Sequence, residues 1–205
     1  MIANCIFEDN HALTSGGAIF VTAATVTVSN SIFWGNSAEE DGGGISAMKI
    51  SRLVVDNCTF ADNVAPSGAG IQSFYFASSI DVTNTIISSN GPGEGLFVEE
   101  GVALAIDHTD IYGNTGGNWV GRISGELGMN GNIEADPRFV DFLGRPFLLH
   151  PASSCIDTGN PSVEDYMYDW HPRVPPLYRD GARSDMGAYG GPGNIQWMPR
   201  ALDHF

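Results

Sequence analysis

A seven-residue motif recurs along the first half of the chain and constrains its fold more than any other feature. Each copy begins and ends with a polar residue, usually asparagine, and its second residue is small and its fourth apolar. The copies are NCIFEDN (4–10), NSIFWGN (30–36), NCTFADN (57–63), NTIISSN (84–90) and HTDIYGN (108–114). A nearly constant period of this length indicates a solenoid, in which each repeat forms one coil.

The segment before each later copy has the alternating pattern of a β-strand. These segments are TVTVS (25–29), RLVVD (52–56), SIDVT (79–83) and ALAID (103–107). Two positions in them stay apolar, namely Val26/Leu53/Ile80/Leu104 and Val28/Val55/Val82/Ile106. The positions between vary freely. We therefore expect one buried and one solvated face, with coils stacked in register.

A third strand is predicted where a glycine pair precedes an apolar residue. The segments GGAI (16–19), GGGI (42–45), GAGI (68–71) and GEGL (93–96) would point Ile19, Ile45, Ile71 and Leu96 inward. Three short strands in each coil predict an all-β parallel β-helix of about five coils.

The asparagines are expected to form two ladders, because stacked identical amides bond to one another and asparagine tolerates a left-handed corner. One ladder would contain Asn10/Asn36/Asn63/Asn90/Asn114, and the other Asn4/Asn30/Asn57/Asn84 with His108 at its end. Between them, the inward side chains would be Cys5/Ser31/Cys58/Thr85/Thr109 and Phe7/Phe33/Phe60/Ile87/Ile111. Cys5 and Cys58 would stand two coils, about 9–10 Å, apart, which excludes a disulfide.

These coils resemble the right-handed parallel β-helix proteins of the pectate-lyase-like superfamily. They are most similar to repeat-rich bacterial surface proteins with GGAI…N-S-x-F-x-x-N coils, and the likeness spans residues 1–119. The resemblance implies a right-handed coil and a secreted or cell-surface location.

In the rest of the chain, residues 120–205, the stretch of about 132–192 resembles the tail of choice-of-anchor Q bacterial surface proteins. The resemblance is carried by NIEADPRFVD (132–141), PFLLHPASSCIDTGNP (146–161) and SDMGAYGGP (184–192). Ser154-Cys155 departs from the usual Pro-Ala, which leaves Cys155 as a small buried residue. We expect this segment to cap the solenoid by packing strands 139–140 and 147–149, with Tyr189, over its open end.

Charge and composition exclude several classes of function. The 24 acidic and 9 basic side chains give a net charge of −15, whereas nucleic-acid binding needs clustered basic residues. A polyuronate would be repelled unless cations intervened. The 3 cysteines have no CxxC spacing, and no apolar run is long enough to span a membrane. Because no signal pattern precedes the first repeat, we expect a fragment or trimmed chain.

Candidate catalytic residues are few. The enzymes of the resembled superfamily project catalytic groups from one sheet, lyases using acids that bind Ca²⁺ with a basic residue, and hydrolases using clustered aspartates. The outward positions of the glycine-led strand carry no charge here. Lys49 and Arg52 near Asp56 could support β-elimination, and the alternative is an exposed, solvated pair.

Two acidic sets are candidates for Ca²⁺, which prefers several oxygen ligands. One set is Glu39, Glu40 and Asp41; the alternative for it is a solvated loop. The other set is Asp136, Asp141, Asp157 and Asp185. The alternative for this second set is a role in turns, where aspartate bonds to its own backbone.

Two features suggest binding. Tyr166, Tyr168, Trp170 and Tyr178 lie in an aromatic, proline-rich stretch that could stack on sugar rings or pack on the cap. The outward column Ile6/Ile32/Thr59/Ile86 would be covered by another subunit, by the C-terminal segment or by a ligand.

The sequence therefore predicts a secreted or cell-surface structural and binding module, whose partner is a carbohydrate or a surface protein. A polysaccharide-acting enzyme, lyase before hydrolase, is the alternative, and a piece of a larger adhesin is the third. The fold alone does not choose among them.

Overall fold

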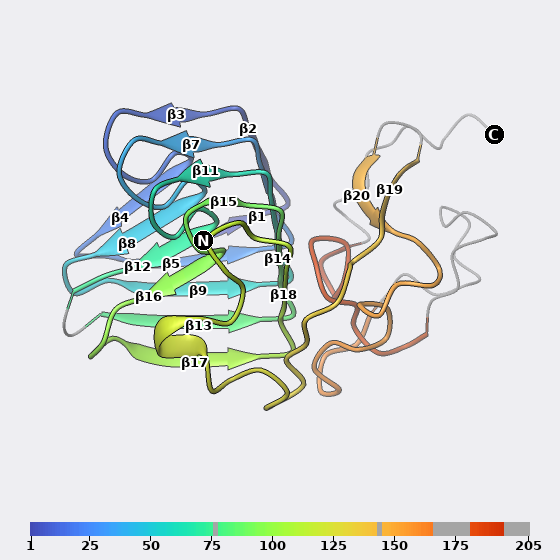
Figure 1. The fold of residues 1–205 in the computed structure, drawn as a ribbon. Coiled ribbons are helices and arrows are strands. Elements are labelled where there is room, and N and C mark those ends of the chain that lie inside the picture. Colours follow the sequence, from blue (N-terminus) through green and yellow to red (C-terminus); the bar gives the residue numbers. More distant parts are fainter. Residues whose placement is uncertain (76–77, 143–144, 166–180, 195–205) are drawn as a thin grey trace.

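A computed structural model describes residues 1–75, 78–142, 145–165 and 181–194. The chain winds into a parallel β-solenoid of about four coils and is nearly free of helix (Figure 1). The predicted parallel β-helix is thus confirmed. Its coils number about four rather than the expected five, because the last motif copy belongs to an incomplete coil that adds strands only to the two five-stranded sheets.

Two five-stranded sheets form most of the solenoid wall. Sheet A has the order β1–β5–β9–β13–β17 and sheet B the order β2–β6–β10–β14–β18. The strands of sheet A are β1 (Ile2–Ala3), β5 (Thr25–Ser29), β9 (Arg52–Asp56), β13 (Ser79–Thr83) and β17 (Ala103–Asp107). Those of sheet B are β2 (Ile6–Glu8), β6 (Ile32–Trp34), β10 (Thr59–Ala61), β14 (Ile86–Ser88) and β18 (Asp110–Tyr112).

Two four-stranded sheets complete each coil. Sheet C contains β3 (His11–Ala12), β7 (Ser37–Ala38), β11 (Val64–Ala65) and β15 (Gly91–Pro92). Sheet D contains β4 (Ile19–Thr22), β8 (Ile45–Met48), β12 (Ile71–Ser73) and β16 (Leu96–Val98). The expectation of three strands per coil was therefore wrong by one. Sheet C was missed because two-residue strands are too short to show an alternating pattern.

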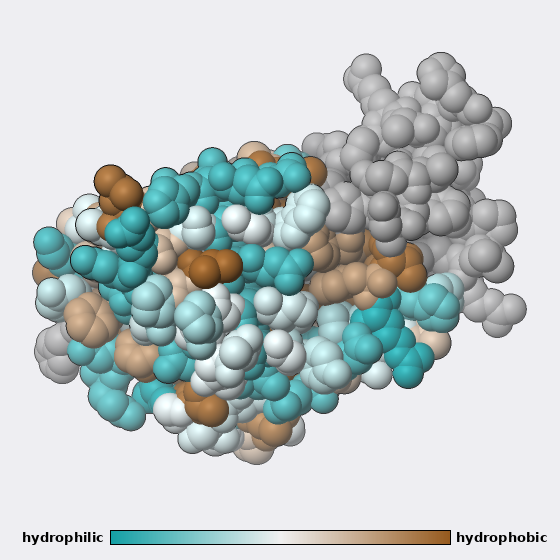
Figure 2. Space-filling model, turned by 45° about the horizontal axis from the view of Figure 1, so that its top comes forward, coloured by the Kyte–Doolittle hydropathy of each residue, from teal (hydrophilic) through white to brown (hydrophobic). Residues whose placement is uncertain are grey.

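The strand registers confirm the predicted inward columns. Val26 pairs with Leu53, and Leu53 with Ile80, in sheet A. In sheet B, Phe7, Phe33 and Phe60 stack with ring centroids 4.7 and 4.5 Å apart. All three cysteines are free, and Cys58 is fully buried. Burial of these columns supplies the main stabilisation of the coils. On the described surface in Figure 2, hydrophobic residues are interspersed among hydrophilic ones.

The first asparagine ladder is also confirmed. Each side-chain Nδ2 donates to the Oδ1 of the next asparagine, at 2.8 Å from Asn10 to Asn36 and at 2.9 Å from Asn36 to Asn63. The series continues at 2.9 Å through Asn90 to Asn114. The same Oδ1 atoms accept the preceding coil's main-chain N–H groups. The ladder satisfies buried polar groups at a corner where the backbone leaves its sheet.

The second asparagine column does not form the predicted ladder. Its members do occupy left-handed corners, with φ of 44° at Asn30, 46° at Asn57 and 49° at Asn84. Their side chains, however, reach outward. Asn30 Nδ2 donates to the main-chain oxygens of Ala188 and Gly190, at 3.2 and 2.6 Å. One rung remains, from Asn84 Nδ2 to Asn57 Oδ1 at 3.3 Å.

From residue 139 onward, the described part of the chain, called the C-terminal segment below, lies along the outer face of sheet B, beside the solenoid rather than over its end (Figure 1). It includes the predicted strands as an antiparallel pair, β19 (Phe139–Phe142) and β20 (Arg145–Leu149). Ile32 packs against Leu148, Ala188 and Tyr189 there. These strands and Tyr189 were expected over the open end and lie on sheet B instead, because its outer face offers apolar side chains and the carboxamides of the second asparagine column.

The last coil is instead covered by the chain that directly follows it. Trp119 and Ile123 join the solenoid core, and Ile123 belongs to the 3₁₀-helix η1 (Gly121–Ile123). Asn118 Oδ1 closes the ladder by accepting from Asn114 N and Nδ2, at 2.9 and 3.1 Å. Asn132 Oδ1 accepts the N–H of Thr109 at 3.1 Å.

Candidate functional site

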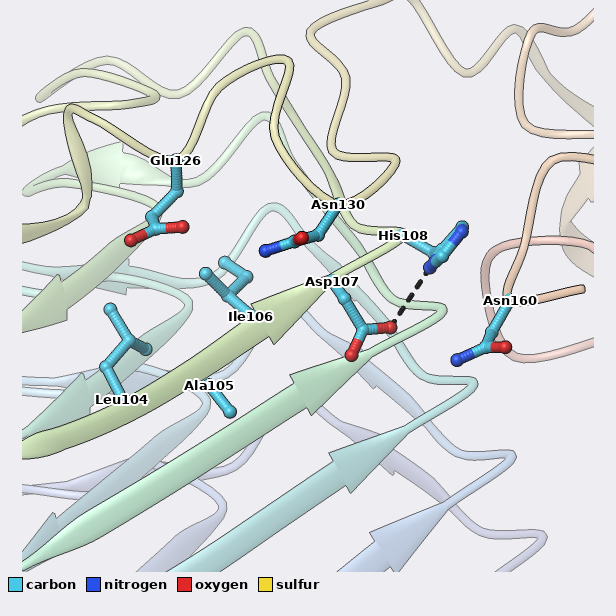
Figure 3. Close-up of a pocket in the computed structure, with 8 residues that line it drawn as sticks. All are labelled: Leu104, Ala105, Ile106, Asp107, His108, Glu126, Asn130 and Asn160. Atoms are coloured by element: carbon cyan, nitrogen blue, oxygen red, sulfur yellow. Dashed lines mark hydrogen bonds and ion pairs between the residues drawn. The ribbon is translucent and has the colours of Figure 1, made fainter. Parts of the chain in front are cut away.

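A groove runs along the outer edge of the last strand of sheet A. Its volume is about 570 Å³. Three segments distant in sequence line it: β17 with the corner after it, the loop after η1, and the C-terminal segment (Figure 3). The lining residues are Leu104, Ala105, Ile106, Asp107, His108, Glu126, Asn130 and Asn160. We call this the β17 groove.

A buried side chain, that of Asn132, helps to hold the loop that forms one wall of the groove. Asn132 is 2 % exposed, and its Nδ2 donates to Ile106 O at 3.2 Å and to Glu126 O at 3.1 Å. The N–H of His108 donates to Asn130 O at 2.9 Å. Asn132 thereby ties the loop to β17 and leaves the side chains of Glu126 and Asn130 beside the groove (Figure 3).

The opposite wall is fixed by the second asparagine column. The N–H of Asn160 donates to Asn84 Oδ1 at 2.6 Å, and the N–H of Gly187 donates to Asn84 O at 2.7 Å. The wall therefore exists only when the C-terminal segment is docked on sheet B.

Asp107 and His108 form a hydrogen-bonded pair at the end of β17. His108 Nδ1 lies 3.1 Å from Asp107 Oδ1 (Figure 3). A carboxylate oxygen can only accept a hydrogen bond, so the bond is donated by the Nδ1–H of the imidazole. Thr83 Oγ1 donates to Asp107 Oδ2 at 3.5 Å. The pair can accept and donate hydrogen bonds towards a ligand in the groove.

The outward face of sheet A adds a further carboxyl in line with the groove. Asp56 pairs in register with Thr83, which pairs with Asp107. Burial raises the pKa of Asp56, and the charge of Asp107 raises it further, against the opposing effect of a hydrogen bond from Asn84. This edge of sheet A is therefore rich in negative potential, which disfavours an anionic ligand.

Another buried carboxyl lies outside the groove, between sheet B and the C-terminal segment. Asp110 is fully buried and accepts the N–H of Ala135 at 3.0 Å and the thiol of Cys155 at 3.3 Å. Burial raises the pKa of Asp110 to about 7. Cys155 is fully buried too, as the sequence suggested, and burial first, with Asp110 second, raises the pKa of its thiol.

The structure does not bring the predicted catalytic residues together. Arg52 begins β9 and Asp56 ends it, and Arg52 forms an ion pair with Asp81 at 2.5 Å. Lys49 lies at an exposed corner with φ of 57°. Arg52 is half-exposed and already paired with Asp81. This environment fits a solvated basic residue better than a catalytic base.

The predicted metal ligands are likewise dispersed. Among the described residues, no three His, Cys, Asp or Glu side chains are placed to hold one metal ion. Asp41 accepts from Ser15 Oγ at 3.3 Å, and Glu39 lies 3.9 Å from His11, while the side chain of Glu40 is exposed. The set of Glu39, Glu40 and Asp41 therefore resembles the solvated loop of the alternative.

The second acidic set has backbone partners in three described cases. Asp136 Oδ1 accepts the N–H of Arg138 at 2.8 Å, which is the turn role that the sequence suggested. Asp157 Oδ1 accepts the N–H of Gly181 at 3.0 Å. Asp185 Oδ1 accepts the N–H of Asp157 at 2.7 Å. The side chain of Asp141 lies outside the described residues.

The two predicted binding features have different outcomes. Tyr166, Tyr168, Trp170 and Tyr178 lie outside the described residues. The outward column of sheet B is covered by the C-terminal segment at Ile32 and Ile86, both fully buried, whereas Ile6 is 48 % exposed. The segment of the same chain, one of the three covers considered for this column, therefore covers Ile32 and Ile86.

Sequence reasoning missed Glu126, Asn130 and Asn160, and named His108 only as the end of a ladder. Asp107 had a weak signal, since it shares a polar outward position with Ser29, Asp56 and Thr83. The loop residues had none, because they stand after the last repeat and belong to no periodic pattern.

The fold and the groove define a β-solenoid with a polar groove at its last coil. The family model described as "Right handed beta helix region" matches residues 1–132, and the chain belongs to this family. Comparison with curated proteins and with solved structures gave no significant match. No helix among the described residues is long and apolar enough to cross a membrane.

Proposed function

We propose that this chain is a secreted or cell-surface β-helix module that binds a carbohydrate in the β17 groove. The observation that carries the proposal is the convergence there of carboxylates, carboxamides and an imidazole, with aliphatic groups between them. Such a lining suits a ligand with many hydroxyl groups and some apolar surface.

The charge of the groove selects among carbohydrates. Asp107 and Glu126 line it, Asp56 extends the same face, and the whole chain carries a net charge of −15. On the outward face of sheet A, the basic side chain of Arg52 is engaged by Asp81. The ligand is therefore a neutral or amino sugar chain rather than a polyuronate. The coil repeat favours an elongated ligand, because strands recur about every 4.8 Å along the axis.

The resemblances seen in the sequence fit this proposal. A pectate-lyase-like superfamily member with a choice-of-anchor Q tail would act at a bacterial cell surface, where polysaccharides are the prevalent ligands. In this chain the tail has a second use, since Asn160 from the tail forms one wall of the groove.

Isothermal titration with neutral, amino and acidic oligosaccharides tests the proposal. Glu126→Gln keeps the shape of the side chain and removes a charged acceptor, and we expect it to weaken binding roughly tenfold or more. Glu40→Gln, the same change in an exposed loop outside the groove, is the matched control and leaves binding unchanged. Binding of none of the oligosaccharides, or equal binding by both variants, contradicts the proposal.

A second candidate function is hydrolysis of the bound polysaccharide. It is favoured by two carboxyl groups, Asp107 and Glu126, in one groove with an imidazole, since glycosidases use paired carboxylates as acid and base. New reducing ends that form with the native chain and are lost in both Asp107→Asn and Glu126→Gln would support it. Binding without any new reducing ends would contradict hydrolysis and support the binding function only.

A further inference from the structure

The chain contains two Asn-Gly dipeptides, and the structure gives them opposite environments. One is Asn90-Gly91 in the ladder, and the other is Asn130-Gly131 at the rim of the β17 groove. In an Asn-Gly sequence the glycine has no side chain to hinder an approach of its nitrogen to the preceding carboxamide. The side-chain environment then decides whether that approach occurs.

Asn90 is held on all sides. It is fully buried, and its Nδ2 donates to Asn114 Oδ1 at 2.9 Å and to Phe60 O at 3.1 Å. Its Oδ1 accepts from Asn63 N and Nδ2, both at 2.9 Å. The N–H of Gly91 donates to Asn63 O at 3.0 Å. Reaction there requires the ladder to break first.

Asn130 is exposed and adopts a left-handed conformation with φ of 49°, followed by Gly131 with φ of 78°. Its side chain has no hydrogen-bond partner among the described residues, and its main-chain oxygen accepts from His108. The imidazole of His108 packs directly on Gly131, where an added Cβ would lie 2.5 Å from His108 Cδ2. The loop is thus anchored, while the carboxamide itself is free to turn.

We propose that Asn130 is a site of spontaneous deamidation, and that Asn90 is protected from the same reaction. The main-chain nitrogen of Gly131 attacks Cγ of Asn130 and forms a five-membered succinimide. The Cγ–Nδ2 bond breaks, and Nδ2 leaves as ammonia with the proton lost by the Gly131 nitrogen. Water then opens the ring at either carbonyl, which yields aspartate or isoaspartate at position 130.

The reaction changes the β17 groove whether or not the groove binds a carbohydrate. Either product replaces a neutral carboxamide by a carboxylate beside Asp107 and Glu126. The isoaspartate product also lengthens the main chain by one carbon at the residue whose oxygen accepts from His108. Deamidation therefore makes the charge of the groove more negative and disfavours the binding of an anion further.

Peptide mapping by mass spectrometry tests the proposal on the folded full chain aged in mildly alkaline buffer. We expect the product at Asn130 to accumulate at least about tenfold faster than the product at Asn90, because the buried site must open before it reacts. In urea the two sites lose their different environments, and their rates converge. Equal rates in the folded chain, or an intact Asn130 there, would overturn the proposal.

Asn130→Gln provides a second, independent readout. Glutamine would have to form a larger ring, which is slower to close. After ageing, we therefore expect this variant to contain much less isoaspartate than the native chain, as measured by an isoaspartate-specific methylation assay. The signal persisting at its native level in the variant would place the reaction elsewhere and refute the assignment. A circular dichroism spectrum that matches the spectrum of the native chain checks that the variant retains the fold.

Discussion

Removal of one carboxamide from the middle of the ladder should destabilise the protein far more than removal of one from its end. Asn63 is fully buried and makes four hydrogen bonds through its side chain. Two are donated, to Asn90 Oδ1 and Phe33 O, and two are accepted from Asn36. Asn63→Ala removes all four bonds, although Asn90 Oδ1 still accepts the main-chain N–H of residue 63 and Asn36 Nδ2 still donates to Phe7 O.

At about 1 kcal/mol for each lost bond, Asn63→Ala should lower the free energy of unfolding by about 4 kcal/mol. For a chain of this size that corresponds to a fall in Tm of about 10 °C. Asn10, at the exposed end, donates one side-chain bond to Asn36. Asn10→Ala should therefore cost about 1 kcal/mol or less.

Urea denaturation followed by circular dichroism measures both variants against the native chain. The comparison is matched, since the same substitution is made in the same column of the solenoid. If the two variants differ by less than about 0.5 kcal/mol, the ladder does not stabilise the coils through its buried hydrogen bonds, and the reasoning fails.

Three further predictions concern a buried carboxyl, a contact of the C-terminal segment and a glycine inside the solenoid. Because burial raises the pKa of Asp110 to about 7, its native state keeps a proton that the unfolded state loses near pH ~4. As the pH rises between these two pKa values, the free energy of unfolding should thus fall by up to about 1.4 kcal/mol per pH unit, and it should level off above the higher value. Denaturation at several pH values should show that Asp110→Asn removes this pH dependence. Asn57→Gly keeps the left-handed corner but loses the side-chain bond to Asp185 O at 3.0 Å, so limited proteolysis of the C-terminal segment should accelerate roughly tenfold or more, while Asn4→Gly leaves it unchanged. Gly44→Ala places a Cβ 2.5 Å from the Gly70 oxygen and should lower Tm, whereas Gly125→Ala meets nothing within 4 Å and should leave it within error.

The fold could be predicted from the sequence because its determinants are local and repeated. The alternation that points Leu53 and Ile80 inward recurs in every coil, so each copy supports the interpretation of the others. Asn63 could be assigned to a ladder for the same reason. The two-residue strands of sheet C were not predicted, since a period cannot be recognised over two residues.

The groove and the place of the C-terminal segment could not be predicted in this way. Asn30 and Asn63 look alike in sequence, and both lie at corners. Yet Asn63 bonds along the stack, whereas Asn30 bonds to Gly190, 160 positions away. Nothing periodic marks such a contact, because it is made once, between segments that no repeat relates.

The sequence by itself thus determined the coil, its core and one ladder, through patterns whose period equals that of the structure. Only the tertiary structure decided what the outward side chains do. Asn84 positions Asn160, and Asn132 positions Glu126, to form the groove around β17. The physical reason is that the residue type at an inward position is set by burial, which is the same in every coil. The contacts of an outward side chain depend instead on which distant segment lies beside it.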